Sequence, residues 1–69
     1  MPLTLAPRGK ESTILRITGK DETRRFLQDM GFIVGGKVTI VNEIGGNVIL
    51  GVKNARVALD RSLAQRIIV

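Results

Sequence analysis

The segment that ends at Gly31 constrains the fold of this chain more than any other. Residues 21–30 place apolar side chains on one stripe of a helix, at the spacing i, i+3, i+4 and i+7. Gly31 follows, and glycine readily takes the left-handed backbone on which many helices end. Phe32 is then placed for the hydrophobic contact that accompanies such an ending. Because a strand-like run begins at Lys37, the pattern predicts one helix inserted ahead of a series of strands.

The predicted helix is short and carries charges beside its apolar stripe. Thr18 or Asp21 is expected to cap its beginning, since either side chain can accept a hydrogen bond from the first turn. Arg25 lies four residues from both Asp21 and Asp29, a spacing that stabilises a helix by about 0.3 kcal/mol per pair. A helix of this length is marginal alone, so its stripe must dock on the rest of the domain. The stripe consists of Thr23, Phe26, Leu27 and Met30.

The residues before the helix are predicted to form one strand and an entry arm. Residues 12–18 have the composition of a strand, with Leu15 and Ile17 on its inner face. A proline-glycine turn precedes this strand. Leu3 and Leu5 alternate ahead of the turn, and we expect them to pair with an edge of the sheet.

Two hairpins follow the helix, and their registers can be derived because opposed residues in a hairpin point to the same side. A two-residue turn at Gly45 and Gly46 would place Ile44, on the apolar face of one strand, opposite Asn47, on the polar face of the next. A three-residue loop, residues 45–47, is therefore predicted, which pairs Ile44 with Val48. A two-residue turn is predicted for the second hairpin at residues 53–54. It pairs Val52 with Ala55, Leu50 with Val57, and Val48 with Leu59.

The order of these elements predicts a mainly β fold. A short helical turn near residues 61–65 and a last strand at residues 67–69 complete the chain. We expect a small, partly open, SH3-like barrel of five to six short strands with one inserted α-helix at about residues 21–30. With 69 residues, the chain is expected to form a single domain, residues 1–69.

The composition argues against catalysis and against a bound metal. The chain has no cysteine and no histidine, and its six acids are scattered. Nucleophiles, general bases and the preferred zinc ligands are therefore missing, so we expect no enzyme activity, no small-molecule substrate, no metal and no cofactor. No run of about 18 apolar residues and no signal-peptide pattern occurs, so a cytosolic location is predicted.

The formal charge of +5 indicates an acidic partner but does not identify it. One hypothesis is a small basic barrel that binds nucleic acid or associates with the ribosome. The cations form no run, the nearest pair being Arg24 and Arg25. The chain also lacks Trp and Tyr, the main platforms on which single-stranded bases stack, so nucleic acid is the less favoured partner.

The connector after the helix holds three consecutive apolar residues, of which at most two can point inward. In one interpretation Phe32 caps the helix and Val34 packs under the sheet. In the other, Ile33 and part of Phe32 form a docking patch with an arginine rim, the usual composition of a protein contact. The predicted partner-binding residues are Arg24, Arg25, Gln28, Phe32 and Ile33.

Several segments of this chain occur in a specific order and spacing. They are residues 7–9 (Pro-Arg-Gly), 24–27 (Arg-Arg-Phe-Leu), 30–32 (Met-Gly-Phe), 37–41, 56–59 (Arg-Val-Ala-Leu) and the ending at 64–69. Together they resemble the FeoA family, small accessory proteins of bacterial ferrous-iron uptake. Val34 departs from that family, which usually has proline there, and the loop at residues 45–47 is often longer in relatives.

The resemblance implies a non-catalytic, cytosolic, regulatory SH3-like protein. Its implied partner is FeoB, a membrane transporter with a cytosolic G-protein domain, which would recruit it to the inner face of the membrane. Because Met1 opens the domain and Val69 closes it, we expect a stand-alone protein. The sequence leaves open which transporter surface is bound, whether nucleotide hydrolysis changes, and whether the protein associates weakly with itself.

Overall fold

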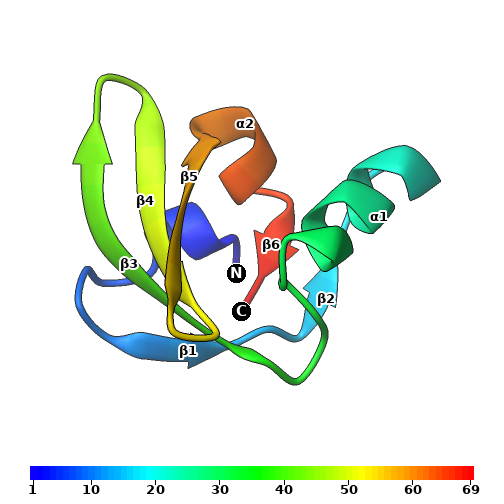
Figure 1. Ribbon diagram of the computed structural model, residues 1–69, viewed down its shortest axis with the longest axis horizontal. Helices are drawn as coiled ribbons and strands as arrows, with labels where there is room; N and C mark the ends of the chain where they lie inside the picture. The colour runs from blue at the N-terminus through cyan, green and yellow to red at the C-terminus, as the bar shows by residue number, and fades with distance from the viewer.

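The computed structural model describes residues 1–69 and shows a mainly β fold with two separate sheets (Figure 1). The larger sheet has the strand order β1–β3–β4–β5, and the smaller one pairs β2 with β6. The sheets do not close into one barrel, which confirms the predicted partly open arrangement. The elements are η1 (Leu3–Leu5), β1 (Glu11–Thr13), β2 (Arg16–Ile17), α1 (Asp21–Asp29), β3 (Lys37–Ile44), β4 (Asn47–Val52), β5 (Ala55–Asp60), α2 (Arg61–Ala64) and β6 (Ile67–Ile68).

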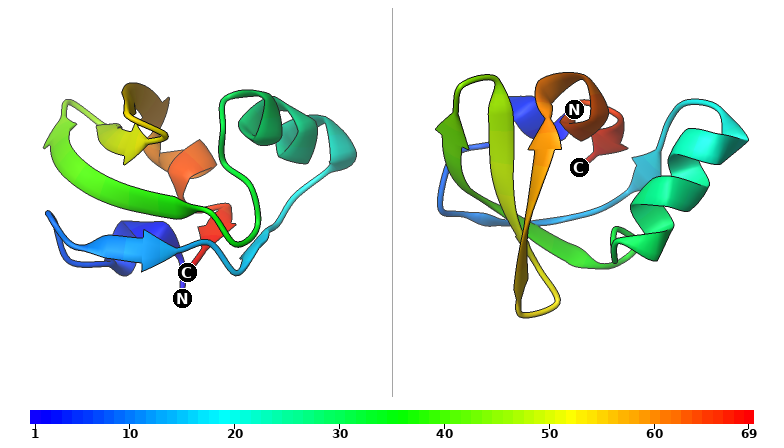
Figure 2. Two further views of the ribbon diagram at one scale, coloured as in Figure 1. Left: turned by 60° about the horizontal axis from the view of Figure 1, so that its bottom comes forward. Right: turned by 45° about the horizontal axis from the view of Figure 1, so that its top comes forward.

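The core lies inside the curved larger sheet, and α1 lies at one side of the molecule. Figures 1 and 2 place α1 opposite the tip of the β3–β4 hairpin in every view. Thirteen residues are buried, and all of them are apolar, so every polar side chain is available at the surface. They are Leu3, Ile14, Ile17, Leu27, Phe32, Val38, Ile40, Val48, Leu50, Val52, Leu59, Ala64 and Ile67.

The end of α1 has the form that the sequence predicts. Gly31 has a φ of 104°. Its N–H donates to the carbonyl of Gln28 at 2.9 Å, and the N–H of Phe32 donates to the carbonyl of Leu27 at 3.0 Å. These two bonds are the Schellman pair that satisfies the last carbonyls of a helix. Phe32 is fully buried, so the hydrophobic contact anchors the end of α1 in the core.

The predicted strand at residues 12–18 is two strands. Its predicted inner face is confirmed for Ile17, which is buried, and wrong for Leu15. Ile14 is buried, whereas Leu15 is 61% exposed. The N–H of Ile14 donates to Gly36, beside the larger sheet, while the N–H of Leu15 donates to Ile68 of the smaller sheet. The chain therefore passes from one sheet to the other at this point, and the change of partner interrupts the alternation of faces.

The predictions for the N-terminal arm and for the start of α1 are also wrong. Leu3 and Leu5 form a 3₁₀ turn instead of pairing with a sheet edge, and only Leu3 is buried. The N-cap of α1 is Lys20, without a side-chain cap. The Thr18 hydroxyl donates instead to the carbonyl of Arg66 at 3.2 Å, so tertiary contact replaces the local cap.

In the first hairpin, a β-bulge in β3, and not a three-residue loop, brings the apolar faces of β3 and β4 to the same side of the sheet. Ile44 pairs with Asn47 across a two-residue turn whose glycines have φ values of 53° and 87°, as a type I′ turn requires. The register then shifts beyond Asn42, which leaves Val41 without a partner and restores the pairing of inward residues. The prediction that Ile44 pairs with Val48 is therefore wrong.

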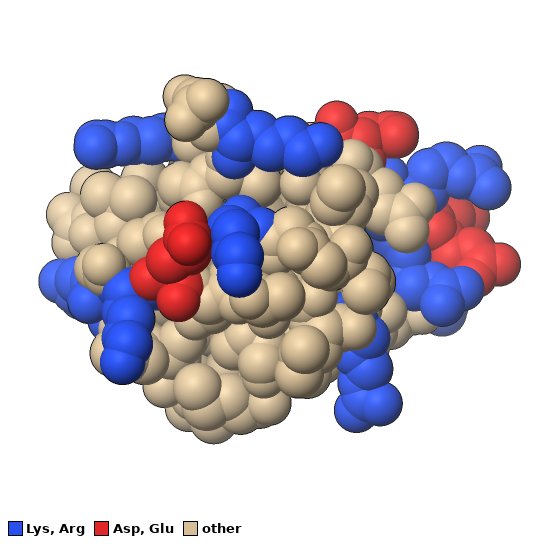
Figure 3. Space-filling model, turned by 90° about the horizontal axis from the view of Figure 1, so that it is seen from below, with Lys and Arg blue, Asp and Glu red and all other residues tan.

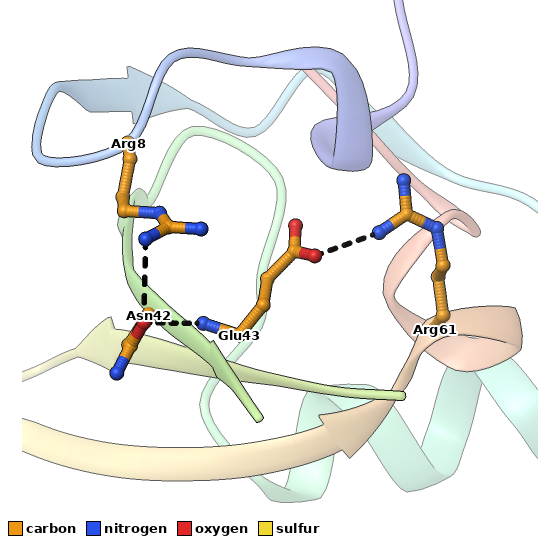
Figure 4. A network of polar contacts seen from close by, with 4 residues as sticks. All are labelled: Arg8, Asn42, Glu43 and Arg61. Carbon is orange, nitrogen blue, oxygen red and sulfur yellow. Dashed lines mark hydrogen bonds and ion pairs between the residues drawn. The ribbon is translucent and has the colours of Figure 1, made fainter. Parts of the chain in front are cut away.

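Glu43, which follows the bulge, points toward Arg61 of α2 (Figure 4). The Asn42 side-chain oxygen accepts bonds from the N–H of Glu43 at 2.9 Å and from Arg8 Nη1 at 3.3 Å. Arg61 Nη1 donates to Glu43 Oε2 at 3.1 Å. Both ends of this ion pair are about half exposed, so it contributes little, in the range of about 0–1 kcal/mol.

The second hairpin confirms the predicted register completely. Lys53 and Asn54 form the two-residue turn with φ values of 47° and 64°. The three predicted pairs, Val52 with Ala55, Leu50 with Val57, and Val48 with Leu59, all occur. The predicted helical turn is α2, and Asp60 caps it by accepting the N–H of Leu63 at 2.9 Å.

Candidate docking surface

α1 exposes most of its surface because little of its apolar stripe is used for packing. Of the four stripe residues, only Leu27 is fully buried, and Phe26 is 49% exposed. Thr23 and Met30 are half-buried. The predicted pairs of Arg25 with Asp21 and Asp29 do not form, and Asp21 pairs with Arg24 instead. The helix is therefore attached mainly through Leu27 and its Schellman end, and its polar side remains accessible.

A groove of about 460 Å³ runs between this polar side of α1 and the smaller sheet. β2 contributes one side of the groove, and the connector after α1 contributes an apolar residue, Val34. Because β2 pairs with β6, the smaller sheet fixes the position of this side. The residues that line the groove are Arg16, Ile17, Asp21, Arg24, Arg25, Gln28 and Val34.

The groove carries an excess of positive charge. Its one carboxylate, Asp21, is paired with Arg24, whereas Arg16 and Arg25 have no carboxylate partner. Figure 3 shows that the cations on the underside of the molecule lie in separate places around a broad uncharged area, and that acids and cations alternate at the α1 end. The positive charge is therefore divided among separate places instead of forming a continuous basic stripe, and in the groove it lies beside the exposed side chain of Val34.

The connector presents Val34 through a tight turn. The N–H of Gly36 donates to the carbonyl of Ile33 at 2.9 Å, and Gly35 has a φ of 86°. A positive φ at the third position is typical of a type II turn, in which Val34 holds the position that proline favours. Val34 is 62% exposed and Ile33 is 40% exposed. The interpretation in which Val34 packs under the sheet is therefore wrong.

The structure brings together some of the predicted partner-binding residues. Arg24, Arg25 and Gln28 line one groove. Ile33 is exposed on the adjoining connector but does not line the groove, and Phe32 is fully buried, so its side chain is not part of this surface. Three lining residues, Arg16, Ile17 and Val34, are not among those predicted from the sequence. The run of three apolar residues was the signal for Val34, whereas nothing local indicated that β2 would face α1.

The remaining chemistry of the surface is limited. No group of three or more Asp, Glu, His or Cys side chains is placed to hold a metal ion. No buried side-chain polar atom lacks a hydrogen-bond partner. The groove itself presents arginine charge and the exposed apolar side chain of Val34 to a partner.

None of the helices is long and apolar enough to cross a membrane.

Two open antiparallel sheets with a helix inserted between β2 and β3 define a small domain of the SH3-like class. The comparison with known families is specific, because a model of the FeoA domain matches residues 1–69. The chain therefore belongs to the FeoA family.

Three related proteins support this assignment. A Methanocaldococcus jannaschii protein named "Putative Fe(2+) transport protein A" is 31% identical over 68 residues, which cover 99% of this chain and 83% of the relative. The crystal structure of an iron uptake regulatory protein (FeoA) matches with a TM-score of 0.86 and 27% identity, over 96% of this chain and 88% of the other. The zinc complex of Stenotrophomonas maltophilia FeoA, described as an SH3 domain protein, matches with a TM-score of 0.85 and 26% identity, over 99% and 87%.

Proposed function

We propose that this protein is a non-catalytic, cytosolic accessory protein of ferrous iron uptake. Its partner is the cytosolic part of a FeoB-type membrane transporter, which brings it to the inner face of the membrane. The names of the related proteins support the link to iron, since they refer to Fe(2+) transport and to the regulation of iron uptake. The S. maltophilia protein is also described as a candidate activating factor of ferrous iron transport.

The observation that carries the proposal is the groove between α1 and β2. Two arginines without carboxylate partners, Arg16 and Arg25, lie beside the exposed apolar residue Val34. Arginine is enriched in protein interfaces, since its guanidinium group is more weakly hydrated than the ammonium group of lysine, and the buried centre of an interface is more apolar than its rim. An acidic or carbonyl-rich surface of the transporter with one apolar side chain would complement this groove.

The test is binding of the purified cytosolic region of the transporter to the protein and to an Arg25→Glu, Val34→Asp variant. The variant reverses one charge and places a carboxylate on the apolar side of the groove. We expect its affinity to fall by at least about tenfold, the loss expected when a central contact worth about 1.4 kcal/mol is removed. Circular dichroism would show that the variant folds. Undiminished binding would remove this groove as the docking surface.

A matched control is the Lys10→Glu, Ile44→Asp variant. It makes the same change of charge and of apolar surface on the loop before β1 and at the β3–β4 tip, which lie away from α1 (Figure 1). We expect it to bind like the unchanged protein. A separate Ile33→Asp variant tests the connector residue that the sequence predicts and that lies outside the groove.

The alternative partner, nucleic acid, stays a prediction with its own test. Binding through phosphates predicts affinity for duplex DNA or structured RNA that falls steeply with salt. Negligible binding at low salt would eliminate this alternative.

A further inference from the structure

Gly51 lies in the middle of β4, where glycine is not needed for the fold. Its φ lies outside the left-handed region, so other residues could adopt its backbone conformation. A Cβ atom built on it would meet Val41 Cγ2 at 3.7 Å and the carbonyl oxygen of Thr39 at 3.9 Å, which are ordinary contacts. Glycine inside a strand lowers stability, and it often marks a place where a ligand or another backbone approaches closely.

The missing side chain leaves a hollow on the outer face of the larger sheet. Val38, Ile40, Leu50 and Val52 point into the core, so Gly51 faces outward between them. The register aligns one row of outward residues across all four strands. A hollow of about 620 Å³ lies over this row. The row consists of Glu11, Thr39, Gly51 and Arg56.

Three cations from different parts of the sheet line the hollow: Lys37 of β3, Lys53 of the β4–β5 turn, and Arg56 of β5. None of them is paired with a carboxylate. Lys37 Nζ donates to Thr13 Oγ1 at 2.6 Å, which uses one of its three N–H groups. The one acid in the lining is Glu11, at the β1 end of the row, and it forms no ion pair.

We propose that this hollow is a docking site for an extended, acidic segment of a protein partner. One carboxylate side chain of the segment lies over Gly51, and the ammonium and guanidinium groups of Lys37, Lys53 and Arg56 surround it. The three unpaired cations supply the charge complementarity. Glu11 favours a peptide with spaced carboxylates over nucleic acid or an anionic membrane, since a continuous polyanion would place negative charge against it. This surface is separate from the groove between α1 and β2.

The test uses a synthetic peptide of alternating glutamate and serine, titrated into the isotope-labelled protein and followed by NMR. We expect saturable shifts at the amides of Thr39, Gly51 and Arg56. A Gly51→Val variant keeps the net charge and fills the hollow, so the affinity should fall by about tenfold. The same variant should unfold at a temperature about 4 °C higher, because it removes a strand glycine. Gly51→Ala is the milder version if the valine variant does not fold.

Matched charge variants separate this site from general attraction to a basic protein. Arg56→Gln and Arg66→Gln remove the same charge, but only Arg56 lines the hollow. We expect the first variant to weaken peptide binding several-fold and the second to leave it unchanged. Equal weakening by both, or full binding to Gly51→Val, would overturn the proposal. Duplex DNA or vesicles of anionic lipid that bind more tightly than the peptide, with the same sensitivity to Gly51→Val, would overturn the assignment of the occupant.

Discussion

The meander of β3, β4 and β5 and the inserted helix α1 hold together by different means. The meander supplies nearly half of the buried residues, whereas α1 itself buries only Leu27. The helix gains its remaining attachment from its Schellman end and from Phe32 just beyond it. The meander therefore determines the fold, and α1 is an attached element whose polar side is free. The meander residues are Val38, Ile40, Val48, Leu50, Val52 and Leu59.

The strongest test of this difference compares the two phenylalanines. Phe32 is fully buried at the junction of α1 and the core, and Phe26 is half exposed on α1. We expect Phe32→Ala to lower the free energy of unfolding by about 3–5 kcal/mol, a large share of the total stability of so small a domain. Phe26→Ala should cost less than about 1.5 kcal/mol. Urea denaturation measures both, and similar costs would contradict the view that Phe32 is the anchor.

A matched pair of leucines compares the two regions with the same chemical change. Leu27 of α1 and Leu50 of β4 are both fully buried. Truncation to alanine should cost about 4 kcal/mol at Leu50 and nearer about 2 kcal/mol at Leu27, because α1 can shift to fill part of the cavity. Hydrogen exchange of the Leu27→Ala variant should quicken mainly in α1. Equal costs, with exchange quickened throughout, would show that α1 and the meander unfold as one unit.

The helix end offers a smaller and more local test. Gly31→Val places a β-branched residue at a φ of 104°, and we expect a cost of about 1–2 kcal/mol. Gly31→Asn serves as the control, since asparagine tolerates a left-handed backbone better, and it should cost less. Thermal unfolding ranks the two variants. Indistinguishable melting temperatures would mean that the backbone at this position relaxes without strain.

The smallest expected effect concerns Asp60, which links the meander to α2. The Ser62 hydroxyl donates to Asp60 Oδ1 at 2.6 Å, and this bond, with the N–H of Leu63, lowers the pKa of the Asp60 carboxyl. A lowered pKa in the folded state means that the ionised cap stabilises the fold above the unfolded pKa, and that this contribution is lost as the pH falls through the folded pKa. We expect Ser62→Ala to raise the pKa of Asp60, measured by NMR titration. An unchanged pKa would contradict this assignment.

The two hairpins show why the sequence predicts some registers and not others. In the second hairpin every inward pair is apolar, so the pattern and the two-residue turn agree on one register. In the first hairpin, the alternation of inward and outward side chains is interrupted because Val41 is an extra, unpaired residue in β3. A bulge is a backbone irregularity that the apolar pattern does not encode, so the pattern predicts a longer loop in its place.

The sequence predicts the part of the candidate docking surface that lies on α1, but not the part that lies on β2 and the connector. Arg24, Arg25 and Gln28 lie off the apolar stripe of α1, and helical periodicity alone places them at the surface. Arg16 and Val34 reach the same groove through tertiary structure, since β2 is positioned by its pairing with β6. Gly51 could not be singled out either, because its significance depends on its neighbours across the sheet.

Binding at the groove between α1 and β2 can be observed by NMR titration of the isotope-labelled protein with the purified cytosolic G-protein region of a FeoB-type transporter. We expect the chemical-shift changes to concentrate on the amides of α1, β2 and Val34, and the amides at the tip of the β3–β4 hairpin to stay unchanged. No shift changes at saturating transporter region, or changes confined to that hairpin tip, would contradict it.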